Sequence, residues 1–170
     1  MDTKTRKLMF SSKTDEWATP KELFNKLNRR YKFTLDPCAN SANAKCEKFY
    51  TFEDDGLSKS WANEVVFVNP PYSNIKDWVS KAHREAATNG ATVVMLIPSR
   101  TDTRYWHDYI MEGADKIYFV KGRIKFENNN QPQKNAAPFP SAIIVFGESN
   151  LIGYTSGPKI YSMDRTHGRI

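Results

Sequence analysis

VVFVNPPYS, residues 65–73, joins an uninterrupted apolar run to an amide, two prolines and a tyrosine. An apolar run such as Val65 to Val68 is typical of a strand that is covered on both faces. Asn69 then offers a side-chain carbonyl as a hydrogen-bond acceptor. The two prolines that follow fix φ and carry no N–H. The stretch therefore predicts a buried strand whose carboxyl end carries a stiff polar turn.

The segment before this strand predicts a helix. In WATPKELFNKLNRRYK, residues 17–32, apolar side chains recur on one face at helical spacing. Thr19 is expected to cap this helix, with Pro20 at its first position. A short strand over residues 33–36 should follow, ending before Pro37.

The segment after the strand continues the alternation of helices and strands. Residues 75–89 carry apolar residues at helical spacing, and Gly90 should end that helix. A short helix is expected at 103–112, and further strands are expected at 92–97, 117–120, 122–126 and 141–146.

Alternating strands and helices with short connections indicate an α/β fold, a mostly parallel sheet flanked by helices on both faces. Ligands of such sheets bind beyond the carboxyl ends of the strands, where Asp36, Asn69 and Pro98 fall. We expect one domain over residues 15–147, a flexible N-terminus over 1–14 and a C-terminal extension over 148–170.

Composition narrows the class of protein. The chain has 170 residues, a formal charge of +6 and a pI of about 9.3, which suits one domain with a polyanionic partner or, alternatively, a merely basic soluble protein. Two cysteines, Cys38 and Cys46, make no disulfide framework, and no zinc spacing accompanies them. The start is too polar for a signal peptide, and the apolar run Val93–Ile97 is too short to cross a bilayer. These features predict a cytoplasmic protein without a membrane segment or a metal.

The residues of Asn69-Pro70-Pro71-Tyr72 suit one kind of ligand. The Asn69 side-chain oxygen and the Pro70 carbonyl could accept both hydrogens of one planar amino group, while Tyr72 offers a flat face for a ring. Orientation between such fixed dipoles would favour attack by an adenine N6 on a methyl group, once the base is flipped out of the duplex. The alternative to a binding site is an ordinary turn after the strand, because N-P and P-P pairs are common in turns.

Six segments, in order, resemble the bacteriophage-type, Dam-like family of DNA N6-adenine methyltransferases. They cover most of residues 15–147: DEWATP (15–20), LDPCANSANAKCEKFYT (35–51), DDGL with Trp61 (54–61), FVNPPYS (67–73), IPSRTDTRYWHDYI (97–110), and GRIKF followed by PFPSAIIVFG (122–147). The resemblance implies a Rossmann-like S-adenosylmethionine-dependent methyltransferase fold. It also implies double-stranded DNA as the substrate, and a bacterial host's cytoplasm as the location if a phage encodes the protein.

The resemblance also implies site residues. Asn69, Pro70, Pro71 and Tyr72 would hold the adenine. S-adenosylmethionine would be bound by a second set, in which the choice between the two aspartates stays open: Trp17, Thr19, Pro20, Asp36, Pro37, Asp54 or Asp55, and Gly56. One departure concerns the wider methyltransferase pattern, which has a glycine-rich loop after the first strand. Here no glycine lies between Asp36 and Asp55, and the small residues 39, 41 and 42 are expected to permit the same close approach.

Two further groups have alternative interpretations. The acidic turn at 53–56 could bind magnesium or accept hydrogen bonds from a ribose, and we favour the acceptor role. Several basic residues follow strand ends in the second half of the chain. If they share one face, they are expected to bind DNA through phosphates or guanine edges, and otherwise they form a solvated charged surface. These residues are Arg100, Arg104, Lys121, Arg123 and Lys125. The main alternatives for function are an RNA or protein-glutamine methyltransferase and an inactive nucleic-acid-binding module. A monomer is expected.

Overall fold

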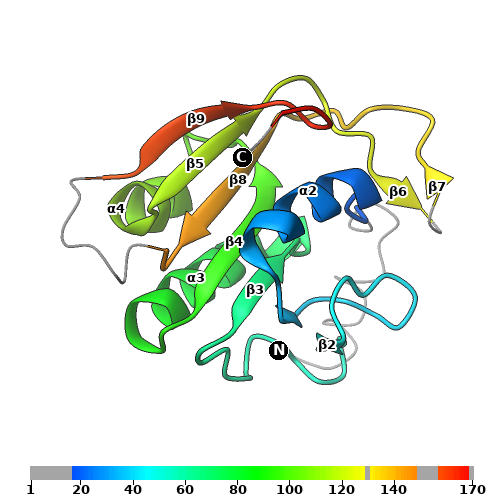
Figure 1. Cartoon of the computed structure of the whole chain (residues 1–170). Coiled ribbons are helices and arrows are strands. Elements are labelled where there is room, and N and C mark those ends of the chain that lie inside the picture. Colours follow the sequence, from blue (N-terminus) through cyan, green and yellow to red (C-terminus); the bar gives the residue numbers. More distant parts are fainter. Residues whose placement is uncertain (1–16, 129–130, 149–156, 169–170) are drawn as a thin grey trace.

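A computed structural model describes residues 17–128, 131–148 and 157–168 of the chain. The predicted flexible N-terminus, 1–14, lies outside these ranges. A seven-stranded sheet with the order β2-β1-β3-β4-β8-β5-β9 forms the centre (Figure 1). Its strands are β1 (Leu35–Asp36), β2 (Lys48–Phe49), β3 (Val65–Val68), β4 (Thr92–Pro98), β5 (Lys116–Val120), β8 (Ser141–Phe146) and β9 (Lys159–Met163).

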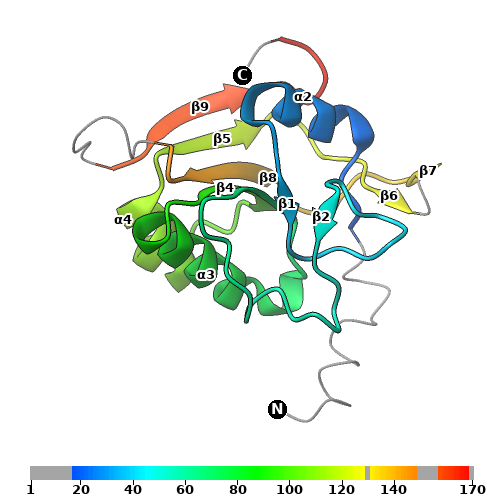
Figure 2. The same ribbon diagram turned by 60° about the horizontal axis from the view of Figure 1, so that its bottom comes forward.

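Helices cover both faces of this sheet (Figure 2). The helix α2 (Lys21–Tyr31) packs on one face through Leu23, Phe24 and Leu27. The other face is covered by α3 (Ile75–Thr88), the π-helical turn η2 (Trp106–Ile110) and α4 (Met111–Gly113). Two apolar clusters therefore sandwich the sheet, as the uninterrupted apolar strands predict. Within the described ranges, no helix has both the length and the apolar content that a membrane crossing requires.

The direction of the strands gathers the predicted site residues at one edge. β1, β3 and β4 are parallel, with Val65 to Val68 of β3 paired in order with Thr92 to Met95 of β4. β1 and β4 end at Asp36 and Pro98, and Asn69 follows the last residue of β3. β8 is antiparallel to both of its neighbours, so its first residue, Ser141, pairs with Pro98 at this same edge. The expected α/β sheet and its edge are confirmed, with β8 as the strand that makes the sheet mixed.

The expected cap of the first helix is wrong. α2 begins at Lys21, Pro20 occupies the capping position, and no side chain caps the helix. Thr19 is 2% exposed, and its hydroxyl oxygen accepts a hydrogen bond from the side chain of Asn69 instead. A threonine followed by proline fits the pattern of a helix cap in sequence. Here the hydroxyl of Thr19 bonds the side chain of Asn69 and does not cap the helix.

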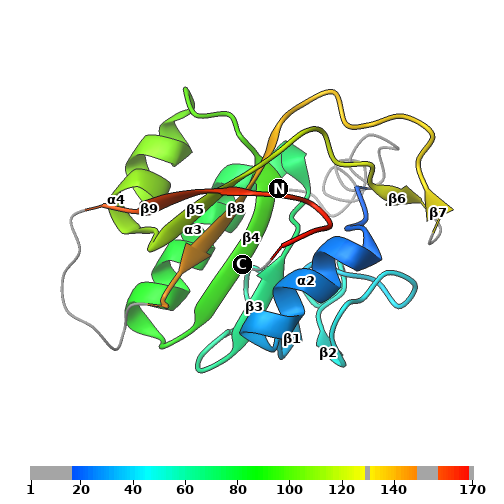
Figure 3. The same cartoon turned by 45° about the horizontal axis from the view of Figure 1, so that its top comes forward.

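The expected strand over 122–126 is also wrong. Gly122 has φ +73°, a left-handed conformation that turns the chain out of the sheet after β5. Ile124 and Phe126 are buried while Arg123 and Lys125 are exposed, which explains the strand-like alternation. The segment instead leads to the small hairpin of β6 (Glu127–Asn128) and β7 (Gln131–Pro132), which stands away from the main sheet (Figure 3).

The last strand had no signal in the sequence. β9 pairs in parallel with β5, from Lys116 with Lys159 to Val120 with Met163. It forms the edge of the sheet, and four of its five residues are exposed, so neither an apolar run nor an alternation marks it. β9 falls inside the predicted extension 148–170 and adds to the same sheet. The boundary at 147 stays a prediction.

Candidate active site

A cavity of about 790 Å³ opens at the carboxyl edge of β1 and β3. Its walls come from the segment before α2, the long connection between β1 and β3, the turn after β3, the helix α3 and the strand β6. The residues that form it are Trp17, Ala18, Thr19, Asp36–Asn43, Lys45, Thr51–Glu53, Asp55–Leu57, Phe67, Asn69, Pro71, Trp78, Glu127 and Asn128.

Most of the predicted cofactor residues meet in this cavity. Trp17, Thr19, Asp36, Pro37, Asp55 and Gly56 line it. Pro20 and Asp54 are not part of its lining. The Asp54 carboxylate accepts hydrogen bonds from the N–H (2.8 Å) and the hydroxyl (2.9 Å) of Thr51, so this side chain closes a turn. Of the two aspartates, Asp55 is the one that reaches the cavity.

The side-chain amide of Asn69 is held in one orientation. Its Nδ2 donates to the backbone carbonyl of Trp17 and, at 3.0 Å, to the hydroxyl oxygen of Thr19. A backbone carbonyl can only accept a hydrogen bond, so the nitrogen of the amide must face Trp17. The oxygen, Oδ1, is thereby turned to the other side, where the hydroxyl of Tyr72 donates to it at 3.2 Å. An oxygen with two acceptor positions keeps one for a further donor.

Tyr72 is fixed from two directions. Its ring is 8% exposed and meets the ring of Phe139 edge to face, with centroids 5.4 Å apart. Phe139 in turn contacts the ring of Trp17 at 5.4 Å. Burial raises the pKa of Tyr72 well above its ordinary value, so its hydroxyl remains a protonated donor to Asn69. The aromatic contacts connect the predicted adenine residues to the predicted cofactor residues.

Gly56 lies where two backbone segments of the cavity wall pack closely together. A Cβ atom on Gly56 would lie 1.9 Å from the carbonyl oxygen of Pro37, so no side chain fits there. Asp55, directly before it, has a left-handed φ of 55°. The glycine is therefore 20 positions beyond Asp36 in sequence but packs against the residue that follows Asp36. The small residues 39, 41 and 42 also line the cavity, and their expected close approach to the cofactor stays a prediction.

The carboxyl group of Asp36 is buried. The residue is 5% exposed, and its carboxylate accepts hydrogen bonds from the N–H groups of Lys45 at 3.1 Å and Cys38 at 3.5 Å. Burial raises its pKa to about 6, although these two hydrogen bonds work in the opposite direction. A group that is positively charged would stabilise the ionised form. Cys38 donates its thiol to the carbonyl of Asn69 at 3.3 Å, and burial raises its pKa, so it remains a neutral packing residue.

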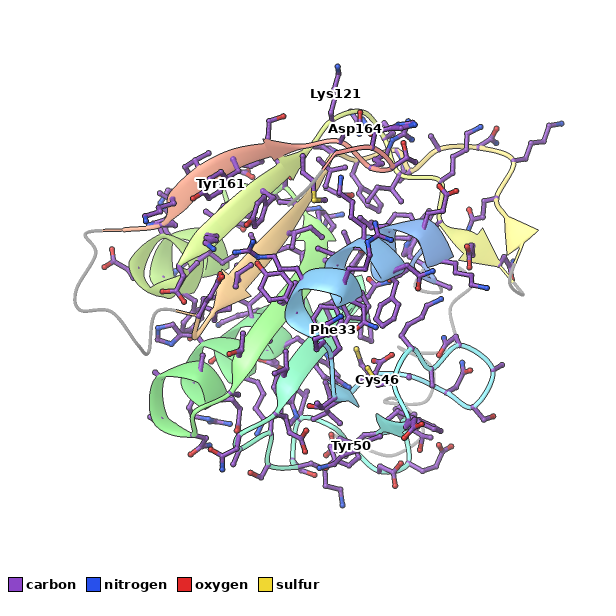
Figure 4. All side chains as sticks on the ribbon, viewed as in Figure 1. Phe33, Cys46, Tyr50, Lys121, Tyr161 and Asp164 are labelled. Carbon is purple, nitrogen blue, oxygen red and sulfur yellow. The ribbon has the colours of Figure 1, made fainter. Side chains whose placement is uncertain are left out.

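The predicted DNA-contacting residues lie at the surface beside this edge. Arg100 follows β4 and is close enough for its charge to act on the Tyr72 hydroxyl. Arg104 is exposed and lies 3.7 Å from the carboxylate of Asp108. Arg123 and Lys125 follow β5 and are exposed. Figure 4 shows Lys121, in the same connection, pointing away from the body of the protein.

The residues that line the cavity without having been predicted as site residues include Trp78, Glu127 and Asn128. The N–H of Glu127 donates to the carbonyl of Ala18 at 2.8 Å, and its carboxylate accepts from the N–H of Lys21 at 2.9 Å. β6 thus holds the segment that contains Trp17 and Thr19 over the cavity. A contact between residues more than a hundred positions apart leaves no local pattern. Trp78 was expected only as a core residue of the second helix.

The acidic turn has no ligand set for a metal. Among the described residues, no group of three histidines, cysteines or acidic residues could hold an ion. The turn instead contributes Glu53, Asp55 and Gly56 to the wall of the cavity.

Comparison with known proteins adds an independent observation. The family described as "DNA N-6-adenine-methyltransferase (Dam)" matches residues 6–160. A DNA N-6-adenine-methyltransferase of Haemophilus phage HP1 (strain HP1c1) is 33% identical over 120 residues, which are 69% of this chain and 69% of that protein. A DNA N-6-adenine-methyltransferase of Escherichia phage T1 is 36% identical over 106 residues, which are 61% of this chain and 44% of that protein.

Proposed function

The chain belongs to the DNA N-6-adenine-methyltransferase (Dam) family, and from this premise we propose that it methylates N6 of an adenine flipped out of double-stranded DNA at a defined short sequence. S-adenosylmethionine is the methyl donor in this proposal. The observation that carries it is the fixed orientation of the Asn69 amide, with Oδ1 turned away from Trp17 and Thr19.

The cavity suits S-adenosylmethionine in its chemistry. A molecule with an ammonium group, a sulfonium and a ribose requires acceptors and a flat apolar surface. Asp36 and Asp55 provide carboxylates in the lining, and Trp17 provides an aromatic ring. The cationic groups of this molecule would also stabilise the ionised form of Asp36, whose pKa burial raises to about 6. When bound, S-adenosylmethionine supplies an electrophilic methyl group.

The residues after β3 orient the amine in this proposal. Oδ1 of Asn69 and the carbonyl of Pro70 accept the two N–H groups of adenine N6, which localises the nitrogen lone pair. Tyr72 places a ring against the base and fixes Oδ1 through its hydroxyl. No strong base takes part, because the gain comes from orientation and from dipoles that are set in advance.

DNA is held by the exposed basic residues at the same edge. Arg100, Arg104, Arg123 and Lys125 are the proposed contacts, with phosphates or with guanine edges. The formal charge of +6 supports a polyanionic substrate. A monomer is proposed.

The test combines the purified protein, unmethylated double-stranded DNA and methyl-labelled S-adenosylmethionine, followed by nucleoside analysis. Label in N6-methyldeoxyadenosine is the expected result, and mapping of the labelled fragments then gives the recognition sequence. Label in a cytosine product would contradict the choice of base. Binding of S-adenosylmethionine without label in any DNA base would favour an RNA or protein substrate, and the absence of binding would favour an inactive module.

A further inference from the structure

Two charged side chains of α3 are buried. Lys81 is 7% exposed and Glu85 is 2% exposed. The Nζ of Lys81 and Oε1 of Glu85 are 2.5 Å apart, one helical turn from each other. A buried ion pair contributes little net stability compared with apolar residues of the same size. The pair therefore points to a role other than stabilising the helix.

Both partners also hold the segment between the acidic turn and β3. Lys81 Nζ donates to the carbonyl of Lys59 at 2.7 Å and lies 5.4 Å from the centre of the Trp61 ring. Glu85 Oε2 accepts from the backbone N–H of Trp61 at 3.1 Å and from the side chain of Asn89 at 2.9 Å. Although burial alone would raise it, these hydrogen bonds hold the pKa of Glu85 below its ordinary value, so the carboxylate is charged.

Trp61 connects the ion pair of Lys81 and Glu85 to the wall of the cavity. Its side chain is completely buried, and its indole N–H donates to the carbonyl of Gly56 at 3.0 Å. Gly56 is the residue that packs against Pro37 with no room for a Cβ, and both of these residues line the cavity. Trp61, Lys81 and Glu85 are not among the described residues that line it. A chain of contacts thus runs from a helix behind the site to the backbone of the cavity wall.

We propose that Trp61, Lys81 and Glu85 are positioning residues: they fix the wall formed by Asp55 and Gly56 and thereby set the affinity of the protein for S-adenosylmethionine without touching it. This inference rests on the proposed function, because it takes the cavity as the site of that molecule. A wall that is already in place requires less ordering when the ligand binds, and the saved conformational entropy appears as affinity.

The sharpest test removes one hydrogen bond and keeps an aromatic side chain, with the lost volume matched by a control. Trp61→Phe loses the indole N–H that reaches Gly56, while Trp106→Phe is the matched control. Trp106 is 1% exposed, belongs to the same apolar cluster and lies outside the cavity lining. We expect Trp61→Phe to raise the Kd for S-adenosylmethionine about 5- to 10-fold, the effect of one lost hydrogen bond. The KM for this molecule should rise in step, with kcat and the Kd for DNA unchanged.

Hydrogen exchange of the wild-type protein gives a second measurement that needs no variant. The amide of Trp61 is bonded to Glu85, and the amides of Asp55 and Ser58 are bonded within the turn. Slow exchange of these amides in the absence of S-adenosylmethionine is expected if the wall is fixed in advance. Exchange as fast as that of an open loop, with protection only after binding, would overturn the inference.

The outcomes separate this inference from the proposed function. If the wild-type protein binds no S-adenosylmethionine, the proposed function fails and this inference fails with it. If the wild type binds and both tryptophan variants bind equally well, the proposed function stands and the positioning role is wrong. Equal losses of affinity in both variants, in step with equal losses of melting temperature, would likewise reduce the role of Trp61 to packing.

Discussion

The hydroxyl oxygen of Thr19 lies 3.0 Å from Nδ2 of Asn69, although 50 positions separate the two residues in the chain. Together with the carbonyl of Trp17, this contact decides which way the Asn69 amide faces. The segment before α2 therefore belongs to the proposed catalytic arrangement as well as to the wall of the cavity.

Thr19→Val tests this relationship directly, because valine keeps the shape of the side chain and removes its acceptor. One constraint on the Asn69 amide is then lost. We expect kcat to fall about 5- to 10-fold, which corresponds to one hydrogen bond of ordinary strength. Thr19→Ser keeps the hydroxyl and should retain most of the activity. Similar turnover numbers in both variants would contradict the orienting role of Thr19.

Asn69→Ala removes the proposed side-chain acceptor for adenine N6. By analogy with the loss of one oxyanion-hole donor, kcat should fall at least ~10²-fold. Binding of DNA, measured by fluorescence anisotropy, should change little because the exposed basic residues provide it. Asn74→Ala, in the turn that follows, is the control and should keep its turnover. An Asn69→Ala variant with nearly normal kcat would rule out the acceptor role.

Tyr72→Phe separates the hydroxyl of this residue from its ring. The ring and its contact with Phe139 remain, but the hydrogen bond to Oδ1 of Asn69 is lost. A decrease in kcat of about 5-fold is expected. Tyr72→Ala removes the ring as well, and stacking of a base on an aromatic side chain contributes roughly 1–3 kcal/mol. Steady-state kinetics should therefore show a much larger loss for Tyr72→Ala, and equal losses would argue against stacking.

The buried carboxyl of Asp36 makes both stability and ligand affinity depend on pH. Its pKa is about 6 in the folded protein against an ordinary value of 3.8, so the folded state holds the proton more tightly. The corresponding stability is fully present below the ordinary pKa and is lost as the pH rises through about 6. Binding of a cationic ligand favours the ionised carboxylate and must have the opposite dependence.

We therefore expect the affinity for S-adenosylmethionine to fall as the pH is lowered from 7 to about 5, with release of protons on binding near pH 6. Calorimetry in two buffers of different ionisation enthalpy measures this release. Asp36→Asn should bind more weakly at pH 7, and its proton release near pH 6 should be abolished. Unchanged proton release in that variant would assign the titration to another group.

Gly56→Ala should damage the cavity through backbone contact alone. The added Cβ would lie 1.9 Å from the carbonyl oxygen of Pro37, and backbone atoms on both sides must move to relieve the overlap. A lower melting temperature and a loss of S-adenosylmethionine affinity of about tenfold or more are expected, because the strained wall belongs to the cavity. Gly157→Ala is the control for a general loss of stability, because Gly157 has a left-handed φ of +79°, so alanine strains its backbone, while the added Cβ would have no neighbour within 4 Å. Equal affinities in the two variants would contradict the role of Gly56.

Much of the sheet could be predicted because its strands follow simple rules. Val65–Val68 and residues 93–97 are apolar throughout, and polar or rigid residues follow them, which is what burial between two helical layers demands. The NPPY turn was correctly placed at the carboxyl edge for the same reason. Such features depend only on neighbouring residues in the chain, so they can be predicted from the sequence.

The remaining features depend on contacts between distant segments. The local sequence predicts Thr19 as a helix cap, but in the folded chain its hydroxyl bonds the side chain of Asn69. The local sequence around Glu127 predicts a loop, but its N–H bonds the carbonyl of Ala18. The packing of Gly56 against Pro37, which lies 19 positions earlier, likewise depends on the folding back of the chain and leaves no local pattern. β9 is exposed on most of its residues, so its membership of the sheet is decided by the backbone of β5 and not by its own side chains.

Trp17 contributes both to the orientation of Asn69 and to the lining of the cavity. Its carbonyl holds the amide of Asn69, while the residue itself lines the cavity proposed for S-adenosylmethionine. A shift of this residue on binding of S-adenosylmethionine would change the acceptor presented to DNA, and we therefore expect the two ligands to be thermodynamically linked. Whatever factor S-adenosylmethionine adds to the affinity for the target adenine, the target adenine must add to the affinity for S-adenosylmethionine.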